Sequence, residues 1–249
     1  MGQVTVTART TFGTVRLALA AVCIVALVSR CIWGLGSVTF NAANFFAYLT
    51  IQSNIAFAVI AVLAGISALR RTTDPKWMTT ARAVVLSCTV TAGIVFGILI
   101  QQAGERSFRI DVPWSDQVLH FWLPAVAILE FLFAPGRGPA PWRTIPVVLG
   151  YPLVWGLATL WRGSVVGWYP YFFLNPALVD GIGEFARFSG LALLLFAGLA
   201  AGFVALSHLR PLVGDAATSR PLARRSERLE CAPGRRDELG IAEAEHPVG

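Results

Sequence analysis

The chain has 249 residues, of which 55% are hydrophobic and 14% are charged, and its mean hydropathy is +0.64. A soluble domain carries about 25% charged residues, so this composition excludes an ordinary soluble protein and indicates an integral membrane protein. The net charge of +6 raises the question of nucleic-acid binding. The basic residues fall between apolar segments, where membrane orientation explains them better, so we expect the lipid bilayer as partner and no nucleic acid.

Six apolar segments are long enough, some only with their flanking aromatic residues, to cross a bilayer. The first could also be a cleaved signal peptide, but no small-x-small cleavage motif follows Val28 and the apolar character resumes after Arg30. The sequence therefore predicts an all-α bundle of six transmembrane helices in residues 1–210 and a disordered polar tail in residues 211–249. The predicted spans are residues 17–36, 45–69, 83–103, 118–133, 145–161 and 185–206.

Basic residues predict the orientation of these spans. Six spans put both termini on one side of the membrane; that side holds thirteen of the Lys and Arg residues near the spans, and the opposite side holds five. By the positive-inside rule we expect a cell-membrane protein with both termini in the cytoplasm. Glu130 lies near the inner end of the fourth span, and we expect its side chain to reach the cytoplasmic interface.

Cysteine usage gives no sign of a metal or redox site. Cys23, Cys31 and Cys88 lie within apolar segments, and neither they nor Cys231 belong to a C-x-x-C pair. This arrangement indicates neither a disulfide framework nor a zinc site. No phosphate-binding loop is present either, so we expect no metal and no cofactor.

Three polar residues stand near the start of the second predicted span. Thr50, Ser53 and Asn54 have the spacing i, i+3 and i+4, which places them on one face of a helix over about one turn. Such residues often join transmembrane helices through hydrogen bonds, and this is the simplest interpretation of the segment alone. A functional interpretation needs a partner at the same depth.

His120 is that partner. Thr50 is five residues in from Phe45, and His120 is five residues in from Ser115, on two spans that both enter from the outer side. At about 1.5 Å rise per residue, both side chains lie roughly 7 Å below the outer boundary. A hydroxyl with an imidazole beside it as general base is the simplest form of an activated nucleophile. A histidine within a span can also be a packed, hydrogen-bonded residue without a catalytic role.

Charged residues near His120 admit several interpretations. Asp116, four residues before His120, could orient the imidazole or cap the helix start. Arg30, in the outer part of the first span, could extend to the interface, hold a substrate carboxylate, or pair with Asp116 or Glu184. The candidate oxyanion donors are Asn54, Ser53 and Trp122.

Several short motifs lie between residues 48 and 172: Tyr48-Leu49-Thr50, His120 followed by Leu123-Pro124 and Glu130, Gly150-Tyr151 with Trp155, and Gly167-Trp168-Tyr169-Pro170-Tyr171-Phe172. Together they are similar to landmarks of the androgen-induced-gene family of membrane proteins and its bacterial six-span relatives. The resemblance implies an intramembrane threonine hydrolase that cleaves fatty acid esters of hydroxy fatty acids. Carried over by resemblance, Thr50 is the nucleophile and His120 the base.

The combined hypothesis is a hydrolase of lipid acyl esters that uses Thr50 and His120. We place Arg30, Ser53, Asn54, Asp116, Trp122 and Tyr169 in its substrate-binding set. The alternative is a non-catalytic membrane protein that binds or carries a lipid or small molecule, in which the same polar residues only satisfy one another.

Overall fold

Helices make up all the regular structure among the described residues of the computed structural model, which are 2–105, 111–209, 211 and 213. Six helical segments in this part of the chain are long and apolar enough to cross a membrane. The prediction of an all-α multi-pass membrane protein with six spans is therefore confirmed. The six segments are Val6–Leu35, Leu49–Arg70, Lys76–Gln101, Trp114–Phe133, Thr144–Val166 and Gly181–His208. Apart from residues 211 and 213, the predicted polar tail lies outside the described residues.

The spans are built from longer and shorter helices than the sequence suggested. The first span belongs to a helix that begins well before residue 17. The predicted second span, residues 45–69, is divided between two helices, and the fourth is composed of three elements. The elements are α1 (Gly2–Leu35), α2 (Ala42–Ala47), α3 (Leu49–Arg70), α4 (Lys76–Glu105), α5 (Trp114–Gln117), the π-helical turn η1 (Val118–Trp122), α6 (Leu123–Phe133), α7 (Thr144–Val166), the 3₁₀ turn η2 (Phe172–Leu174) and α8 (Gly181–His208).

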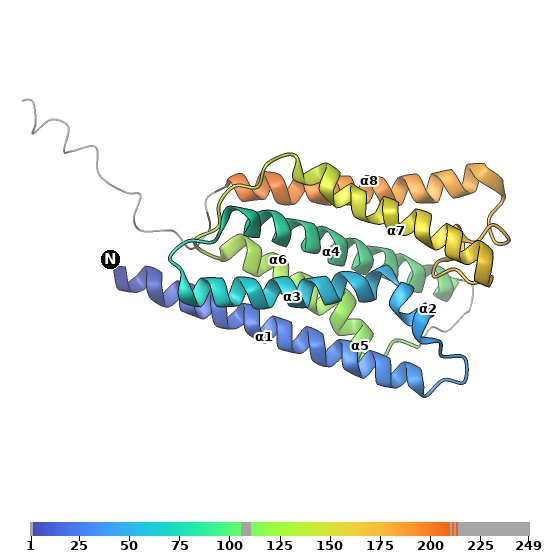
Figure 1. The fold of residues 1–249 in the computed structure, drawn as a ribbon, viewed down its shortest axis with the longest axis horizontal. Helices are drawn as coiled ribbons and strands as arrows, with labels where there is room; N and C mark the ends of the chain where they lie inside the picture. Colours follow the sequence, from blue (N-terminus) through green and yellow to red (C-terminus); the bar gives the residue numbers. More distant parts are fainter. Residues whose placement is uncertain (1, 106–110, 210, 212, 214–249) are drawn as a thin grey trace, which may run out of the picture. The chain divides into compact units, whose positions relative to one another are not determined.

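The long helices of the bundle run side by side, with the N-terminus at one end and α2 and α5 at the other (Figure 1). We call these the N-terminal end and the distal end. Helix α4 is central, because it contacts α3, α6, α7 and α8, whereas α1 lies against α3 and also contacts α5, η1 and α6. Elements from the first, second and fourth spans therefore meet at the distal end.

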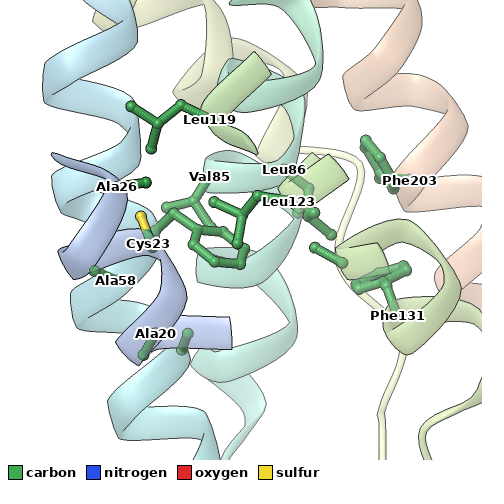
Figure 2. Close-up of a cluster of buried hydrophobic side chains, with 14 residues drawn as sticks. Ala20, Cys23, Ala26, Ala58, Val85, Leu86, Leu119, Leu123, Phe131 and Phe203 are labelled. Carbon is green, nitrogen blue, oxygen red and sulfur yellow. The ribbon is translucent and has the colours of Figure 1, made fainter. Parts of the chain in front are cut away.

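Small residues allow the close approach of α1 to its neighbours. Ala20, Cys23 and Ala26 recur every three residues on one face of α1 and are almost completely buried. Figure 2 shows this face beside Ala58 of α3, within the same apolar cluster as Leu119 of η1. Small side chains at a helix interface let backbones pack closely when lipid supplies no hydrophobic driving force.

A buried network of ion pairs joins helices at the N-terminal end. Glu130 of α6 accepts hydrogen bonds from Arg16 Nε of α1, at 2.7 Å, and from Arg82 Nη2 of α4. Asp74, between α3 and α4, accepts bonds from Arg9 Nη2 at 2.8 Å and from Arg16 Nη1 at 3.3 Å. We call these five residues the N-terminal ion network. The prediction that Glu130 reaches the interface is wrong, because its side chain is only 6% exposed and both its oxygens are held by arginines.

Candidate active site

A break between α2 and α3 places Thr50 in the first turn of a helix. Tyr48 has extended backbone angles, φ −63° and ψ 130°, and its carbonyl accepts from the amides of Ile51 at 3.1 Å and Gln52 at 3.2 Å. We predicted one continuous span from residue 45, so the break is a correction. Its consequence is that the Thr50 amide belongs to the group of N-terminal N–H groups that have no acceptor within their own helix.

Side chains of the next turn fix the backbone of Thr50. Asn54 Nδ2 donates to the Thr50 carbonyl at 2.9 Å, and Ser53 Oγ donates to the same oxygen at 3.1 Å. Asn54 is fully buried and its own carbonyl accepts from Cys23 Sγ at 3.3 Å. The polar face predicted from the spacing exists, but Ser53 and Asn54 bond inward to the backbone and do not line the cavity beside Thr50.

His120 lies in η1, a single π-helical turn. Pro124 follows four residues later; it has no N–H to give to the His120 carbonyl, and its ring clashes with that carbonyl in a regular α-helix. The wider turn relieves this conflict, and turns of this type are frequent at functional sites. On the facing helix α4, Gly93 lies directly against the His120 carbonyl, where a Cβ atom would collide with the oxygen. Phe96 stacks on the imidazole with ring centres 3.8 Å apart.

The Thr50 hydroxyl and the His120 ring are within hydrogen-bond reach. His120 Nε2 lies 3.3 Å from Thr50 Oγ1, and His120 Nδ1 lies 2.8 Å from the carbonyl oxygen of Asp116. Because a carbonyl only accepts, Nδ1 carries a proton, and in the neutral ring Nε2 then presents a lone pair to the hydroxyl. This is the arrangement that a general base requires, and it meets the depth match predicted from the sequence.

Asp116 orients the imidazole through its backbone and not through its carboxylate. The carboxylate Oδ1 instead accepts from Arg30 Nε at 2.9 Å. The ion pair between Arg30 and Asp116 was one of the predicted alternatives and is confirmed, whereas contact of the Asp116 side chain with the ring was not found. Arg30 is 25% exposed at its side chain and also lies over the ring of Trp33. Among the described residues its guanidinium bonds only through Nε, which leaves both Nη groups for other partners.

A cavity of about 260 Å³ opens beside Thr50 and His120. We call it the catalytic cavity. Its polar wall includes Arg30, Asp116 and Tyr171, and its apolar wall comes from α2, α3 and α4. The remaining lining residues are Phe45, Tyr48, Ile51, Ala92, Val95, Phe96, Leu99 and Pro170. Thr50 and His120 are each less than a tenth exposed, so water has little access to either side chain.

Tyr171 is the cavity residue that the sequence analysis missed. It lies in the loop between α7 and α8, where it lines the cavity beside Thr50. Burial raises the pKa of Tyr171 to about 12, so the phenol keeps its proton. Tyr171 belongs to the aromatic run from which Tyr169 was chosen. The sequence offered only the run as a signal, and the position of Tyr171 in the cavity lining beside Thr50 now distinguishes it from Tyr169.

Two predicted substrate-binding residues lie away from the cavity. Trp122 is 66% exposed on the outside of the bundle. Tyr169 packs its ring against Gly163 of α7 and does not line the cavity. Arg30 and Asp116 are thus the members of the predicted set that join Thr50 and His120 at this cavity.

Within the described residues, no group of three or more His, Cys, Asp and Glu side chains is arranged to hold a metal ion. Comparison of the chain with protein-family models, with curated proteins and with solved structures gave no match.

Proposed function

We propose that this protein is an intramembrane hydrolase of lipid acyl esters, with Thr50 as nucleophile and His120 as general base. One observation carries the proposal. The Thr50 hydroxyl lies 3.3 Å from an imidazole nitrogen whose partner nitrogen is held by the Asp116 carbonyl, and both residues line the catalytic cavity. The base is thereby oriented by a third group, which is the logic of catalytic triads.

The first half of the reaction forms an acyl-enzyme. Thr50 Oγ1 attacks the ester carbonyl carbon while His120 Nε2 takes the hydroxyl proton. The tetrahedral intermediate collapses, the bond from carbonyl carbon to alkoxy oxygen breaks, and His120 gives the proton to the departing alcohol. The acid part of the substrate is then esterified to Thr50.

The second half restores the enzyme. His120 Nε2 takes a proton from a water molecule, whose oxygen attacks the acyl carbon. The bond between that carbon and Thr50 Oγ1 breaks, Thr50 regains its proton from His120, and a carboxylic acid leaves. No oxidant, reductant or metal is needed to balance either half.

Tyr171 and the Thr50 amide are the oxyanion donors of this mechanism. Tyr171 lines the cavity beside Thr50, and the amide belongs to the nucleophilic residue itself. The amide is at the N-terminus of α3, whose dipole favours negative charge. Fixed donors aimed at developing charge inside a water-poor site contribute more than they would in water.

Arg30 gives the catalytic cavity a place for a negatively charged substrate group. Neither of its Nη groups has a hydrogen bond among the described residues, and within that part of the chain Asp116, with which it pairs, is the other charged residue of the cavity lining. A lipid ester that also bears a free carboxylate fits this arrangement. We further propose that the distal end faces outward in the cell membrane and that both termini are cytoplasmic, from the distribution of basic residues.

Labelling by a lipophilic fluorophosphonate tests the proposal. The wild-type protein in membranes should be labelled, and Thr50→Ala and His120→Ala should not, because one lacks the nucleophile and the other its base. Thr50→Ser should keep the label. Thr89→Ala is a matched control, since Thr89 is a buried threonine whose hydroxyl bonds only to carbonyls of its own helix. Equal labelling of all variants would rule out the hydrolase and leave the non-catalytic binder.

A further inference from the structure

A second cavity of about 260 Å³ lies between α4, α7, α8 and the η2 segment. We call it the apolar chamber. Leucine, phenylalanine, alanine and valine side chains dominate its wall, together with the ring of Trp155. Thr91 and Ser189 contribute hydroxyl groups that have no hydrogen-bond partner among the described residues.

The apolar chamber and the catalytic cavity share a wall. Ala92, Val95 and Tyr171 line both spaces. Leu49, the residue before the nucleophile, lines the apolar chamber, whereas Thr50 itself lines the catalytic cavity. The chamber therefore begins one residue from the reacting hydroxyl, on the far side of the Tyr171 ring.

The two cavities differ in chemistry in the way that the two parts of a lipid ester differ. The catalytic cavity contains an ion pair, an imidazole and hydroxyl groups. The apolar chamber contains no charged residue in its lining. A charged head that extended into the chamber would lose its hydration and meet no opposite charge in the lining, with only the Thr91 and Ser189 hydroxyls as polar partners. A hydrocarbon chain loses no such hydration.

We infer that the apolar chamber is the acyl-chain subsite, in which the chain of the bound ester passes Tyr171 and ends between α7 and α8. This inference rests on the proposed function. In the acyl-enzyme, the carbonyl carbon is bonded to Thr50 Oγ1, the carbonyl oxygen faces Tyr171 and the Thr50 amide, and the chain fills the chamber. The alcohol part occupies the catalytic cavity on the side of Arg30.

The chamber predicts a chain-length dependence. Transfer of one methylene from water into an apolar site contributes about 0.8 kcal/mol, which is a factor of about four in kcat/KM when this is referred to the concentration of free ester in water. For a series of esters with one leaving group, kcat/KM should rise by about this factor per methylene from butyryl upward, until the chamber is full. The rise should then stop.

Gly156→Leu tests which space the chain occupies. Gly156 of α7 lines the chamber, and a Cβ atom built there meets nothing within 4 Å, so the new side chain enters open space. Gly150→Leu is the matched control on the same helix, because its Cβ is equally free and the residue does not line the chamber.

We expect Gly156→Leu to hydrolyse butyryl esters as the wild type does and to lose roughly 16- to 64-fold in kcat/KM on palmitoyl esters, the equivalent of two or three excluded methylenes. Gly150→Leu should keep the wild-type profile on both. A palmitoyl-to-butyryl ratio in Gly156→Leu equal to that of the wild type would overturn the subsite.

Failure of the proposed function gives a different result. In that case Thr50→Ala hydrolyses butyryl esters as fast as the wild type, whatever the chain-length profile. Photo-crosslinking of a non-hydrolysable hexadecyl ether with a diazirine at its chain end, to the wild-type protein, then tests the chamber without turnover. Adducts on buried chamber residues such as Phe196 and Leu49 support the subsite, and adducts confined to the lipid-facing surface overturn it.

Discussion

The two ends of the bundle solve the problem of polar groups inside a membrane protein in opposite ways. At the N-terminal end, Arg9, Arg16 and Arg82 are paired with two carboxylates whose side chains are 1% and 6% exposed. The enclosed space beside this network is about 20 Å³, room for about one water molecule. At the distal end, the neutral pair of Thr50 and His120 borders a cavity of about 260 Å³.

The difference teaches which polar cluster holds the fold and which is available for chemistry. Full charges that satisfy one another across α1, α4 and α6 join those helices, and removing one leaves a costly unpaired charge. A hydroxyl and a neutral imidazole can be left beside an open space at much lower cost. The size of the cavity next to polar residues in a span therefore indicates better than their number whether they have a structural or a functional role.

The largest effect should come from Glu130→Gln. Loss of one partner from a buried ion network costs about 3–5 kcal/mol, because Arg16 and Arg82 keep their charge without a carboxylate between them. Unfolding free energy measured in mixed detergent micelles should fall by that amount, while hydrolysis per folded molecule is unchanged. Glu184→Gln is the control, since its pair with Arg187 is long, at 4.0 Å, and exposed, and should lose less than about 1 kcal/mol.

Tyr171→Phe, at the distal end, should lower activity and leave stability nearly unchanged, the reverse of Glu130→Gln. Removing an oxyanion donor lowers kcat by about 10²- to 10³-fold, with little change in stability. Tyr151→Phe is the control, because Tyr151 donates to Gln52 Oε1 at 2.7 Å outside the catalytic cavity. It should lose about 1 kcal/mol of stability and keep its kcat.

Since the pKa of Tyr171 is about 12, wild-type activity should show no loss from this phenol below about pH 11. A kcat for Tyr171→Phe within a few-fold of wild type would remove it from the mechanism.

Gly93→Ala tests the placement of His120 from the neighbouring helix. The added methyl group collides with the His120 carbonyl, so α4 and η1 must separate, and a shift of about 1 Å can cost about 10²-fold in rate. Gly97→Ala, one turn away, has its nearest contact at 3.7 Å from Phe121 and should be tolerated. Similar kcat values for the two variants would show that the backbone contact at Gly93 does not position the base.

Arg30→Gln should give the smallest effect on stability. Its pair with Asp116 is partly exposed, and such pairs contribute at most about 1 kcal/mol. The effect on substrate choice should be larger. KM for an ester that carries a free carboxylate should rise roughly tenfold, equivalent to about 1.4 kcal/mol, and KM for the matching methyl ester should not change. Equal KM changes for both esters would contradict carboxylate recognition by Arg30.

The sequence was sufficient for the features that depend on local pattern. Runs of apolar residues predicted six spans, and counting residues from the ends of two spans placed Thr50 and His120 at one depth, where the structure brings them within 3.3 Å. Both inferences use only helix rise and bilayer thickness, which do not depend on tertiary contacts.

Features set by distant contacts were not predictable. The break at Tyr48 has no glycine or proline to announce it; Trp155 Nε1 donates to the Ala47 carbonyl at 2.9 Å, and the Tyr48 ring meets Trp168 and Tyr171 edge-on. Glu130 was expected at the interface because its partners come from α1 and α4, far away in the sequence. Tyr171 reaches Thr50 only through the fold of the loop after α7.

The π-helical turn at Val118–Trp122 gives the fourth span one residue more than an α-helix would hold over the same rotation. Because its hydrogen bond closes five residues apart, the extra residue is accommodated while Asp116 on one side and α6 on the other keep their facing. Deleting one residue from this turn should therefore leave both flanking segments close to their present faces and restore ordinary α-helical winding between them. The altered part would be the turn itself, where a carbonyl of the preceding turn would again meet the Pro124 ring and the imidazole would shift relative to Thr50.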